Sequence, residues 1–437
     1  MIPVVRNLLF VSFGLVLGVA LVSQGDELAG RGAEPRAALP LTELRTFTEV
    51  FAKIKDDYVE SVGDKDLLEN AIRGMLSGLD PHSTYLDAEA YRELQVGTSG
   101  EFGGLGIEVS MEGGFVKVIA PIDDTPAQRA GVQAGDVIIR IDDTPVKGMN
   151  LMDAVKRMRG KPGTKIVLTI VREGQEKPVK IELTRAVIQV KSVKFRLLEK
   201  DYGYVRLSQF QNNTGAELRK ALTSLKEENG GALRGMVLDM RNNPGGILGE
   251  AVSVADTFLQ DGLIVYTKGR IEDAQLKFKA TPPDWLKGAP LVVLINGGSA
   301  SASEIVAGAL QDHNRAVILG TRSFGKGSVQ TIFPMASGAA LKLTTALYYT
   351  PSGRSIQAEG IAPDIDLAPV KVSAVEADQE LVKERDLAGH LQNGNGDNKS
   401  EMQGAGGAAP ESLIETDYQL YEALNLLKGL NILQQRT

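Results

Sequence analysis

Near its start, the chain repeats apolar residues with the spacing of an amphipathic helix. The positions i, i+3, i+4, i+7 and i+11 lie on one helical face, and here they are Phe47, Val50, Phe51, Ile54 and Tyr58. The pattern predicts helical structure over residues 41–79, with a second helix beginning near Lys65. Two helices this short cannot enclose a core of their own. We therefore expect them to pack on the body of the protein or on a partner subunit.

Residues 96–186 change to short β-rich runs separated by glycines. Runs of β-branched residues predict strands, and they occur at 115–119, 136–141, 164–171 and 178–183. Between these runs the pattern predicts a short helix that ends at Gly131 and an amphipathic helix over 151–158. This order of elements predicts a small β-rich domain with two helices.

Residues 200–370 alternate between apolar strands and helices. Each of two strands leads into a glycine-rich loop and then a helix: 235–240 before 248–259, and 290–295 before 303–313. Continuous apolar strands followed by helices predict a parallel sheet that is covered on both faces. Because ligands bind outside the carboxyl ends of such strands, we expect the two loops to meet at one edge of the sheet.

The N-terminal segment is typical of an export signal. Arg6 precedes an apolar run over residues 8–22, which is short for a membrane span. Residues 1–23 therefore predict a signal peptide or an uncleaved membrane anchor, with residues 24–40 as a linker. In either case we expect the body of the protein to be exported.

The C-terminal segment combines polar, low-complexity and amphipathic stretches. Residues 371–392 are polar, and residues 393–412 are rich in Gly, Asn and Ala. The last stretch places leucines on one helical face, namely Leu413, Leu420, Leu424 and Leu427. For residues 371–437 we predict a polar linker and helices that associate with a second copy of the chain. The alternative is that the last helix folds back on its own chain.

The composition excludes several classes of protein. A net charge of −7 argues against nucleic acid as the main partner. The chain has no cysteine, so disulfides, thiolate metal ligands and a cysteine nucleophile are excluded. It has no His-Glu-x-x-His motif and no calcium-loop spacing, so we expect neither a metal nor another cofactor.

Two short segments carry the candidate chemistry: a serine-rich turn before a helix, and a lysine among glycines. The turn contains Ser299, Ser301 and Ser303, and spacing alone does not select one, although Ser303 fits the N-cap of the helix. Glu304 in the first helical turn fits support of the helix dipole or ordering of the site. Lys326 offers a base.

The three histidines are poor candidates for the base. His313 follows Ser301 by 12 residues along one predicted helix, which separates them by roughly 18 Å. A general base must come within about 3 Å of the hydroxyl. His390 lies in the polar tail, and His82 fits a solvated turn or an N-cap. An ordinary Ser-His-Asp triad is therefore not expected, and the sequence favours a serine hydrolase that uses lysine.

Two other interpretations of the lysine loop fit less well. Residues 320–327 nearly match a Walker A loop, but Gly327 stands where that motif needs Ser or Thr, and a strand pattern follows. Ser323 and Lys326 match Ser-x-x-Lys, but the glycines beside the lysine oppose the helical turn of that motif.

Taken together, the ordered motifs resemble the C-terminal processing peptidase family, also called tail-specific proteases. The resemblance covers about residues 45–370 and is carried by 79–85, the 96–186 domain, 239–246, 299–305, 324–330 and 353–357. It implies an α/β peptidase core that contains a parallel sheet and is crotonase-like, an inserted β-rich PDZ domain, and helical N- and C-terminal segments. We expect the helical region at 41–95, the PDZ domain at 96–186 and the core at 187–370, with part of 60–95.

The resemblance also implies roles for individual residues. Members of the family are exported serine proteases with a Ser/Lys dyad, whose nucleophile, base and lysine-orienting glutamine match Ser301, Lys326 and Gln330. Its oxyanion donors match backbone N–H groups of Gly245, Gly246 and Ala302. The implied activity is an endopeptidase that processes or degrades cell-envelope proteins. The alternative is an inactive PDZ-bearing envelope scaffold or chaperone.

The PDZ-like region resembles a domain that binds C-terminal tails. Its carboxylate-binding loop matches Gly104, Leu105, Gly106 and Ile107, where glycines let backbone N–H groups converge on a carboxylate. Leu151, Ala154, Val155 and Met158 are candidates for the peptide groove, although Leu151 and Met158 equally fit the domain's own core. The expected partners are proteins with accessible C-terminal tails, a second copy of the chain, and an envelope adaptor protein.

Overall fold

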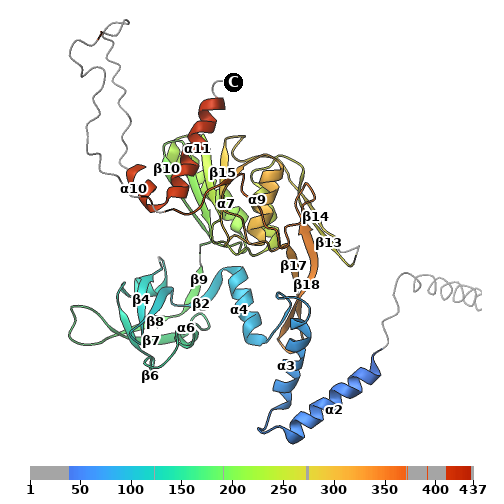
Figure 1. Cartoon of the computed structure of the whole chain (residues 1–437). Helices are drawn as coiled ribbons and strands as arrows, with labels where there is room; N and C mark the ends of the chain where they lie inside the picture. The colour runs from blue at the N-terminus through green and yellow to red at the C-terminus, as the bar shows by residue number, and fades with distance from the viewer. Residues whose placement is uncertain are drawn as a thin grey trace, which may run out of the picture. The chain divides into compact units, whose positions relative to one another are not determined.

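The computed structural model describes residues 39–122, 124–189, 191–271, 275–370, 372, 391 and 410–434 (Figure 1). The predicted export signal, most of the 24–40 linker and most of the polar stretches after residue 370 lie outside the described residues. The chain divides into two units, the first ending at Met75 and the second beginning at Leu76.

The first unit contains the predicted N-terminal helices. Helix α2 spans Leu41–Asp57, and α3 spans Asp64–Ser77, whose last two residues belong to the second unit. The predicted helices are confirmed, with a break between Asp57 and Asp64. In the described part of the chain, no residue of α2 is buried, and Val50 is 53% exposed. Packing of this face on a partner stays a prediction.

The second unit begins with a short strand that completes the core. Strand β1 (Thr84–Leu86) pairs antiparallel with β18 (Ala340–Tyr349), which lies far along the chain. Helix α4 (Ala88–Ser99) follows. It starts at Asp87, whose carboxylate accepts hydrogen bonds from Glu89 N and Ala90 N.

The PDZ region is an antiparallel sheet with two helices. Its strands, in sheet order, are β3 (Ile107–Glu112), β4 (Phe115–Pro121), β5 (Val137–Ile141), β7 (Lys165–Val171) and β8 (Val179–Thr184), and β6 (Thr144–Pro145) pairs with β5. The helices are α5 (Pro126–Arg129) and α6 (Leu151–Met158). Strands β2 (Glu101–Gly104) and β9 (Ala186–Gln189) pair where the chain enters and leaves the domain. All four predicted strands and both helices are present.

The peptidase core is built on a six-stranded sheet. Its order is β10 (Val193–Glu199), β11 (Tyr202–Leu207), β12 (Gly235–Asp239), β15 (Leu291–Ile295), β16 (Val317–Gly320) and β19 (Ile365–Asp366). The strands from β11 to β19 run parallel, and β10 is antiparallel to β11. Every residue of β12 and β15 is buried, because both faces of the sheet are covered as the sequence predicts.

Three helices cover one face of this sheet: α7 (Thr214–Asn229), α8 (Leu248–Asp256) and α9 (Ala302–Asp312). Their apolar residues form one buried cluster with the sheet residues that point to the same side. In this cluster Leu222 and Val306 are fully buried, as are Leu238 and Val293 of the central strands. Helix α9 begins directly after the serine-rich turn, at the carboxyl end of β15.

The C-terminal helix covers the other face, which corrects a prediction. Helices α10 (Pro410–Thr416) and α11 (Tyr418–Gln434) follow the undescribed stretch. Leu420, Leu424 and Leu427 of α11 pack in one buried cluster with Val237 and Val292 of the sheet. Because strand residues alternate in direction, these valines need a cover on this side. The expectation that the last helix associates with another copy through its leucines is therefore wrong. The homo-oligomer itself stays a prediction.

A second, antiparallel sheet carries the lysine loop. Strand β17 (Ser328–Pro334) pairs with β18, which also pairs with β13 (Leu263–Gly269), and β14 (Lys277–Lys279) pairs with β13. Lys326 lies two residues before β17 begins. Residues 84–86 thus reach this sheet from the N-terminal side, as expected for a core that uses part of 60–95.

Candidate active site

The serine-rich turn places Ser301 at the N-cap of α9 in a strained conformation. Its φ is 57° and its ψ is −112°, a combination that costs on the order of 1–3 kcal/mol and persists only where the surroundings enforce it. The Oγ of Ser299 donates to Met240 O at 2.8 Å, and the Oγ of Ser303 donates to Asn243 O at 2.9 Å. Both of these serines are fully buried. The structure thus leaves Ser301 as the candidate nucleophile, and the expected N-cap role of Ser303 is wrong.

The glycine loop after β12 lies directly against this turn. A Cβ at Gly245 would lie 2.8 Å from the Cβ of Ser301, and a Cβ at Gly246 would lie 2.0 Å from Phe210 O. Both residues have positive φ, at 98° and 145°. Only glycine allows the backbone to approach so closely in these conformations.

Two backbone N–H groups beside Ser301 are candidates for an oxyanion hole. Within the described residues, neither Gly246 N nor Ala302 N has a hydrogen-bond acceptor. The N–H of Gly245, by contrast, donates to Asn243 Oδ1 at 2.9 Å. The expectation that Gly245 is a donor is therefore corrected: it provides space, whereas Gly246 and Ala302 have N–H groups to offer.

A buried carboxylate joins the serine turn to the lysine loop. Glu304 is fully buried and accepts four hydrogen bonds. The donors are Ser301 N at 2.7 Å, Ser323 Oγ at 2.6 Å, Gly325 N at 2.6 Å and Lys326 N at 2.9 Å. Of the two interpretations open for this residue, the structure supports ordering of the site. A glutamate three residues after a helix-starting serine is the ordinary capping-box pattern. The sequence therefore did not indicate that Glu304 also binds the lysine loop.

Lys326 is half-buried and lines the same cavity as Ser301. The cavity has a volume of about 460 Å³ and also contains Gly246 and Ala302 in its wall. Burial, followed by the positive charge of Lys342, lowers the pKa of Lys326, and the negative charge of Glu304 opposes both. A lysine with a lowered pKa is neutral more often at a given pH and can then accept a proton.

Tyr348 is a site residue that the sequence did not indicate. Its hydroxyl donates to Lys326 O and forms a hydrogen bond with the Ser301 side chain. Burial raises the pKa of Tyr348 far above its ordinary value, an effect that the bond with Ser301 opposes, so the hydroxyl stays protonated. In the sequence, Tyr348 is indistinguishable from an ordinary core tyrosine of a strand. Only the folded structure shows that it contacts Lys326 and Ser301.

Gln330 lines the cavity, but its hydrogen bonds differ from the expected one. Its Nε2 donates to Ser328 Oγ at 2.9 Å and to Ser328 O at 3.2 Å, and no bond to Lys326 is formed among the described residues. A bulge between Val329 and Gln330 changes the register of the strand. A bulge re-aims the side chains after it, which simple spacing from Lys326 cannot foresee.

Neither of the two described histidines forms a hydrogen bond with Ser301 among the described residues. His313 bonds through Nε2 to Leu263 O at the C-terminal end of α9, away from Ser301. His82 lies in a turn, and its N–H donates to Asp80 Oδ1 at 2.8 Å. Burial and then the charge of Lys326 lower the pKa of His82.

The PDZ candidates divide between the core and the rim. Leu105 is buried, and Gly106 has a φ of 78° and packs against Thr125. Met158 belongs to the buried core of the domain with Ala154, so its assignment to the groove is wrong.

The other candidates of α6 lie at the edge of the core. Leu151 and Val155 are half-buried, and Val155 lines a cavity of about 550 Å³ with Phe102 and Arg159.

In the part of the chain that the structure describes, no group of three or more acidic or histidine side chains could hold a metal.

Comparison with known proteins defines the class as a serine-type peptidase with a PDZ domain. Residues 201–367 match the model of peptidase family S41, residues 103–183 match the PDZ domain, and residues 20–90 match the N-terminal domain of the activating protease CtpB. The chain is 46% identical over 428 residues to a carboxy-terminal-processing protease of Bartonella bacilliformis, covering 97% of this chain and 96% of that protein. The chain therefore belongs to the carboxy-terminal-processing protease family.

Other relatives are similar over most of the chain. A probable CtpA-like serine protease of Staphylococcus epidermidis is 35% identical over 84% of this chain and 73% of its own length. The solved structure of a photosystem II D1 C-terminal processing protease is 33% identical, covers 74% of this chain and 86% of its own, and gives a TM-score of 0.44. The family models, the 46% identical relative and the arrangement of the sheets confirm the expected fold class and a serine-type peptidase.

Proposed function

We propose that this chain cleaves peptide bonds near the C-termini of exported proteins with Ser301 as nucleophile and Lys326 as base. One observation carries the proposal. The strained Ser301, the unpaired N–H groups of Gly246 and Ala302, and a lysine with a lowered pKa all face one cavity. No histidine among the described residues offers a comparable base.

The geometry supports an acyl-enzyme mechanism. Neutral Lys326 takes the proton of Ser301 as Oγ attacks the substrate carbonyl, and the oxyanion accepts from Gly246 N and Ala302 N. The ammonium then protonates the leaving amine, and the neutral lysine next activates the water that hydrolyses the ester. Tyr348 orients Ser301, and Gln330 lies in the wall of the same cavity, where its amide is bound to Ser328.

The cavity walls suit small apolar side chains. They include Leu94, Ile247, Leu248, Ile305, Val329 and Ile332. Burial of apolar surface in such a pocket favours substrates with an apolar residue before the cleaved bond.

The PDZ domain supports capture of a substrate tail before cleavage. Domains of this class bind extended C-terminal peptides by strand addition, with the carboxylate in a backbone loop. The apolar run at residues 8–22 supports export, and the substrates would then be proteins of the cell envelope. An adaptor protein that brings such substrates is part of this proposal.

The test compares wild type with Ser301→Ala and Lys326→Met on an unfolded protein that ends in an apolar tail. We expect each variant to lose at least about 1000-fold in kcat, and the double variant to be no worse, because the two residues act as one unit. Wild type that binds the substrate and never cleaves it would support the inactive scaffold. Full activity of Lys326→Met would overturn the lysine base.

A further inference from the structure

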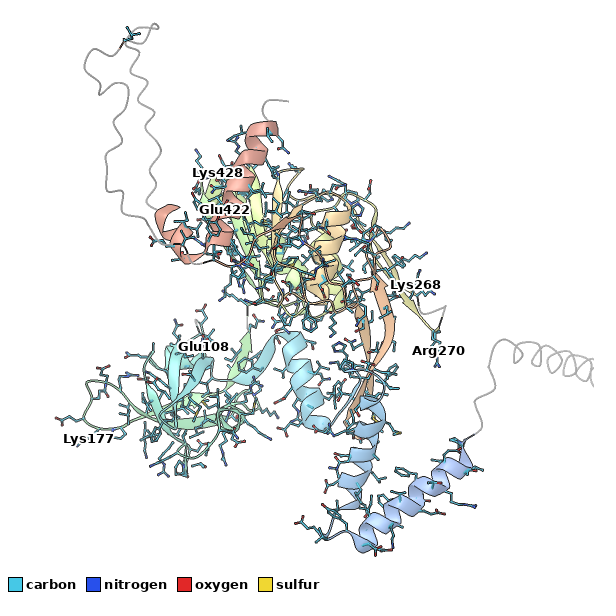
Figure 2. All side chains as sticks on the ribbon, viewed as in Figure 1. Glu108, Lys177, Lys268, Arg270, Glu422 and Lys428 are labelled. Carbon is cyan, nitrogen blue, oxygen red and sulfur yellow. The ribbon has the colours of Figure 1, made fainter. Side chains whose placement is uncertain are left out.

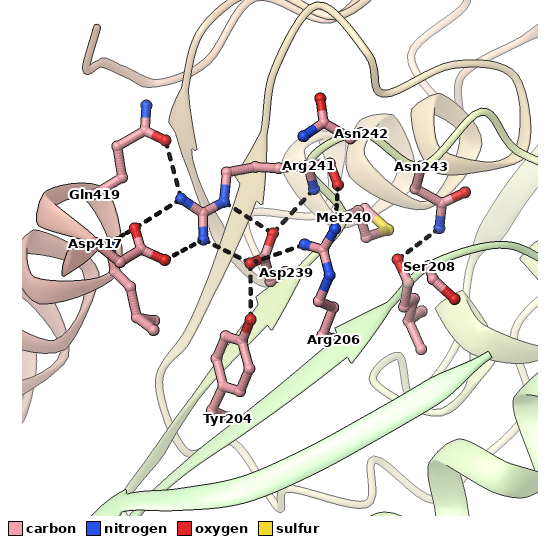
Figure 3. A network of polar contacts seen from close by, with 12 residues as sticks. Tyr204, Arg206, Ser208, Asp239, Met240, Arg241, Asn242, Asn243, Asp417 and Gln419 are labelled. Carbon is pink, nitrogen blue, oxygen red and sulfur yellow. Dashed lines mark hydrogen bonds and ion pairs between the residues drawn. The ribbon is translucent and has the colours of Figure 1, made fainter. Parts of the chain in front are cut away.

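Arg241, the residue that opens the glycine loop, is bound by two carboxylates (Figure 3). Its guanidinium donates to Asp239 through Nε at 3.0 Å and Nη2 at 2.6 Å. It also donates to Asp417 through Nη1 at 2.8 Å and Nη2 at 2.7 Å. Both contacts are bidentate, a geometry that fixes the plane of the guanidinium as well as its distance.

One of these carboxylates comes from the C-terminal helix. Asp417 is the residue before α11, and its Oδ1 also accepts from Leu420 N at 3.1 Å. Gln419 adds a second contact, because its Oε1 accepts from Arg241 Nη1 at 3.1 Å while its Nε2 donates to Leu367 O at 2.6 Å. The start of α11 is thus bound to Arg241 from 176 residues away along the chain.

The charges of the cluster balance only when Asp417 is included. Asp239 is fully buried and also accepts from Tyr204 Oη at 2.9 Å and pairs with Arg206 at 3.2 Å. Two guanidinium groups therefore face two carboxylates. Removing Asp417 would leave one buried positive charge without its partner, which is strongly unfavourable.

The backbone connects this cluster to the candidate oxyanion hole. Arg206 Nη2 donates to Arg241 O at 3.1 Å, and Arg241 N donates to Asp239 Oδ1 at 3.0 Å, so the first residue of the loop is bound at both ends. Two residues later, Asn243 O accepts from Ala300 N and Ser303 Oγ of the serine turn. The same Asn243 orients Gly245 through Oδ1, and Gly246 follows directly. A shift of Arg241 would therefore be passed to Gly246 N through the four residues between them.

We propose that the start of α11 is a positioning element of the active site, in which Asp417 and Gln419 fix Arg241 and thereby the oxyanion donor Gly246 N. This inference rests on the proposed function, since Gly246 N of the 241–246 loop acts as an oxyanion donor only if Ser301 is acylated. It makes Asp417 a positioning residue rather than a catalytic one, because among the described residues its carboxylate accepts hydrogen bonds from Arg241 and Leu420 N and from no residue of the serine turn or the lysine loop.

Asp417→Asn is the decisive variant. Asparagine caps a helix as well as aspartate does, so the bond to Leu420 N is retained while the charge that faces Arg241 is lost. The matched control is Lys428→Met on the same helix (Figure 2), which removes the ion pair with Glu199 at 2.8 Å and does not touch the loop. Both variants, wild type and Ser301→Ala are measured as full-length protein.

The readouts separate positioning from general stability. For Asp417→Asn we expect kcat to fall about tenfold with KM within about twofold, because a displaced donor costs part of the 100-fold or more that a deleted one costs. The affinity for a peptide boronic acid, which forms a tetrahedral adduct with serine, should fall by a similar factor. Lys428→Met should keep both values, and its melting temperature should fall less than that of Asp417→Asn, because the ion pair that it removes is more exposed.

A double variant tests whether the effect passes through Arg241. Arg241→Gln should lower kcat at least as much as Asp417→Asn, and adding Asp417→Asn to it should lower kcat no further, since residues that act through one contact are not additive. A wild-type kcat in Asp417→Asn, or an equal loss in Lys428→Met, would overturn the inference. If either of these results is found and Ser301→Ala is inactive, the positioning role of Asp417 is wrong but the proposed peptidase function is retained.

Discussion

Two glycine-rich loops of this chain are candidates for binding an anion with backbone N–H groups, and they are fixed in different ways. The peptidase loop 241–246 is bound by buried polar side chains, among them Asp239 and Asn243. The PDZ loop 104–107 is bound by backbone groups and one hydroxyl: Gly106 O accepts from Ile122 N and from Thr125 Oγ1. A charge that develops only in a transition state requires donors already in place, whereas a carboxylate that is always charged can be bound by a loop that adjusts.

The largest difference between the loops should appear when each receives a methyl group. In Gly245→Ala the new Cβ would lie 2.7 Å from Ala300 O at a φ of 98°, so we expect kcat on a short peptide to fall by at least about 100-fold. In Gly106→Ala the Cβ would lie 2.3 Å from that of Thr125, and only capture of tail-bearing proteins should weaken.

Gly249→Ala is the matched control for both variants, because no described atom outside the backbone of its own helix and its two chain neighbours would lie within 4 Å of the new Cβ, and alanine favours the helix. Steady-state kinetics on a short peptide and on a tail-bearing protein separate the two effects. An equal loss of kcat on the short peptide in Gly245→Ala and Gly106→Ala would contradict the assignment of catalysis to the first loop and tail capture to the second.

A buried carboxylate should matter only to the peptidase loop. In Glu304→Gln the new NH₂ group must face N–H donors, because each carboxylate oxygen accepts at least one backbone N–H. An unsatisfied buried donor costs about 1–3 kcal/mol, so we expect a lower melting temperature and a kcat reduced by about 30-fold or more. Peptide binding to the PDZ domain, measured by fluorescence anisotropy, should not change. Unaltered kcat would show that Glu304 does not order the site.

The pH dependence should report the lysine and its neighbour. A free lysine has a pKa of about 10.4. Because the pKa of Lys326 is lowered, kcat/KM should rise with pH, and the midpoint of this rise should lie below the pKa of a free lysine. The charge of Lys342 contributes to the lowering, so Lys342→Gln should move the profile to higher pH. Gln330→Glu should also move it upward, since a carboxylate favours the ammonium. A profile in Lys342→Gln that moves to lower pH would have the wrong sign for this electrostatic account.

A smaller effect should distinguish free from amidated tails at the PDZ loop. Amidation removes the carboxylate that backbone N–H groups bind, so we expect affinity to fall several-fold, on the order of 1 kcal/mol. Anisotropy with matched peptides measures the difference. Equal affinities would mean that the domain does not bind C-termini through residues 104–107.

Assembly should depend on the N-terminal helix and not on the last one. Val50 and Ile54 of α2 are exposed, whereas the leucines of α11 are buried in the chain's own core. We therefore expect Val50→Asp with Ile54→Asp to reduce the mass measured by light scattering. The Lys428→Met variant, whose helix face remains packed, should keep the mass of wild type. A monomeric wild type would contradict the predicted homo-oligomer.

The sequence by itself determined the order of the elements and most of the chemistry. Strands 115–119, 136–141, 235–240 and 290–295 and the helices after the two core strands follow from periodicity, because covered faces demand apolar residues at fixed intervals. The residues around Ser301 and Lys326 indicate a serine hydrolase that uses lysine, since chemistry of this kind depends on residue types in short segments, and the resemblance of the ordered motifs to a known family implies a peptidase.

Only the tertiary structure decided what each of these residues contacts. An amphipathic pattern shows that α11 buries a face, but it does not say whether a neighbour or its own sheet covers that face. Spacing could not choose among three serines or detect the bulge before Gln330. It also could not reveal that Glu304 and Tyr348 reach the site or that Asp417 binds Arg241, because these contacts join segments far apart in the chain. Such contacts depend on how the two sheets and the last helix pack, which no local pattern records.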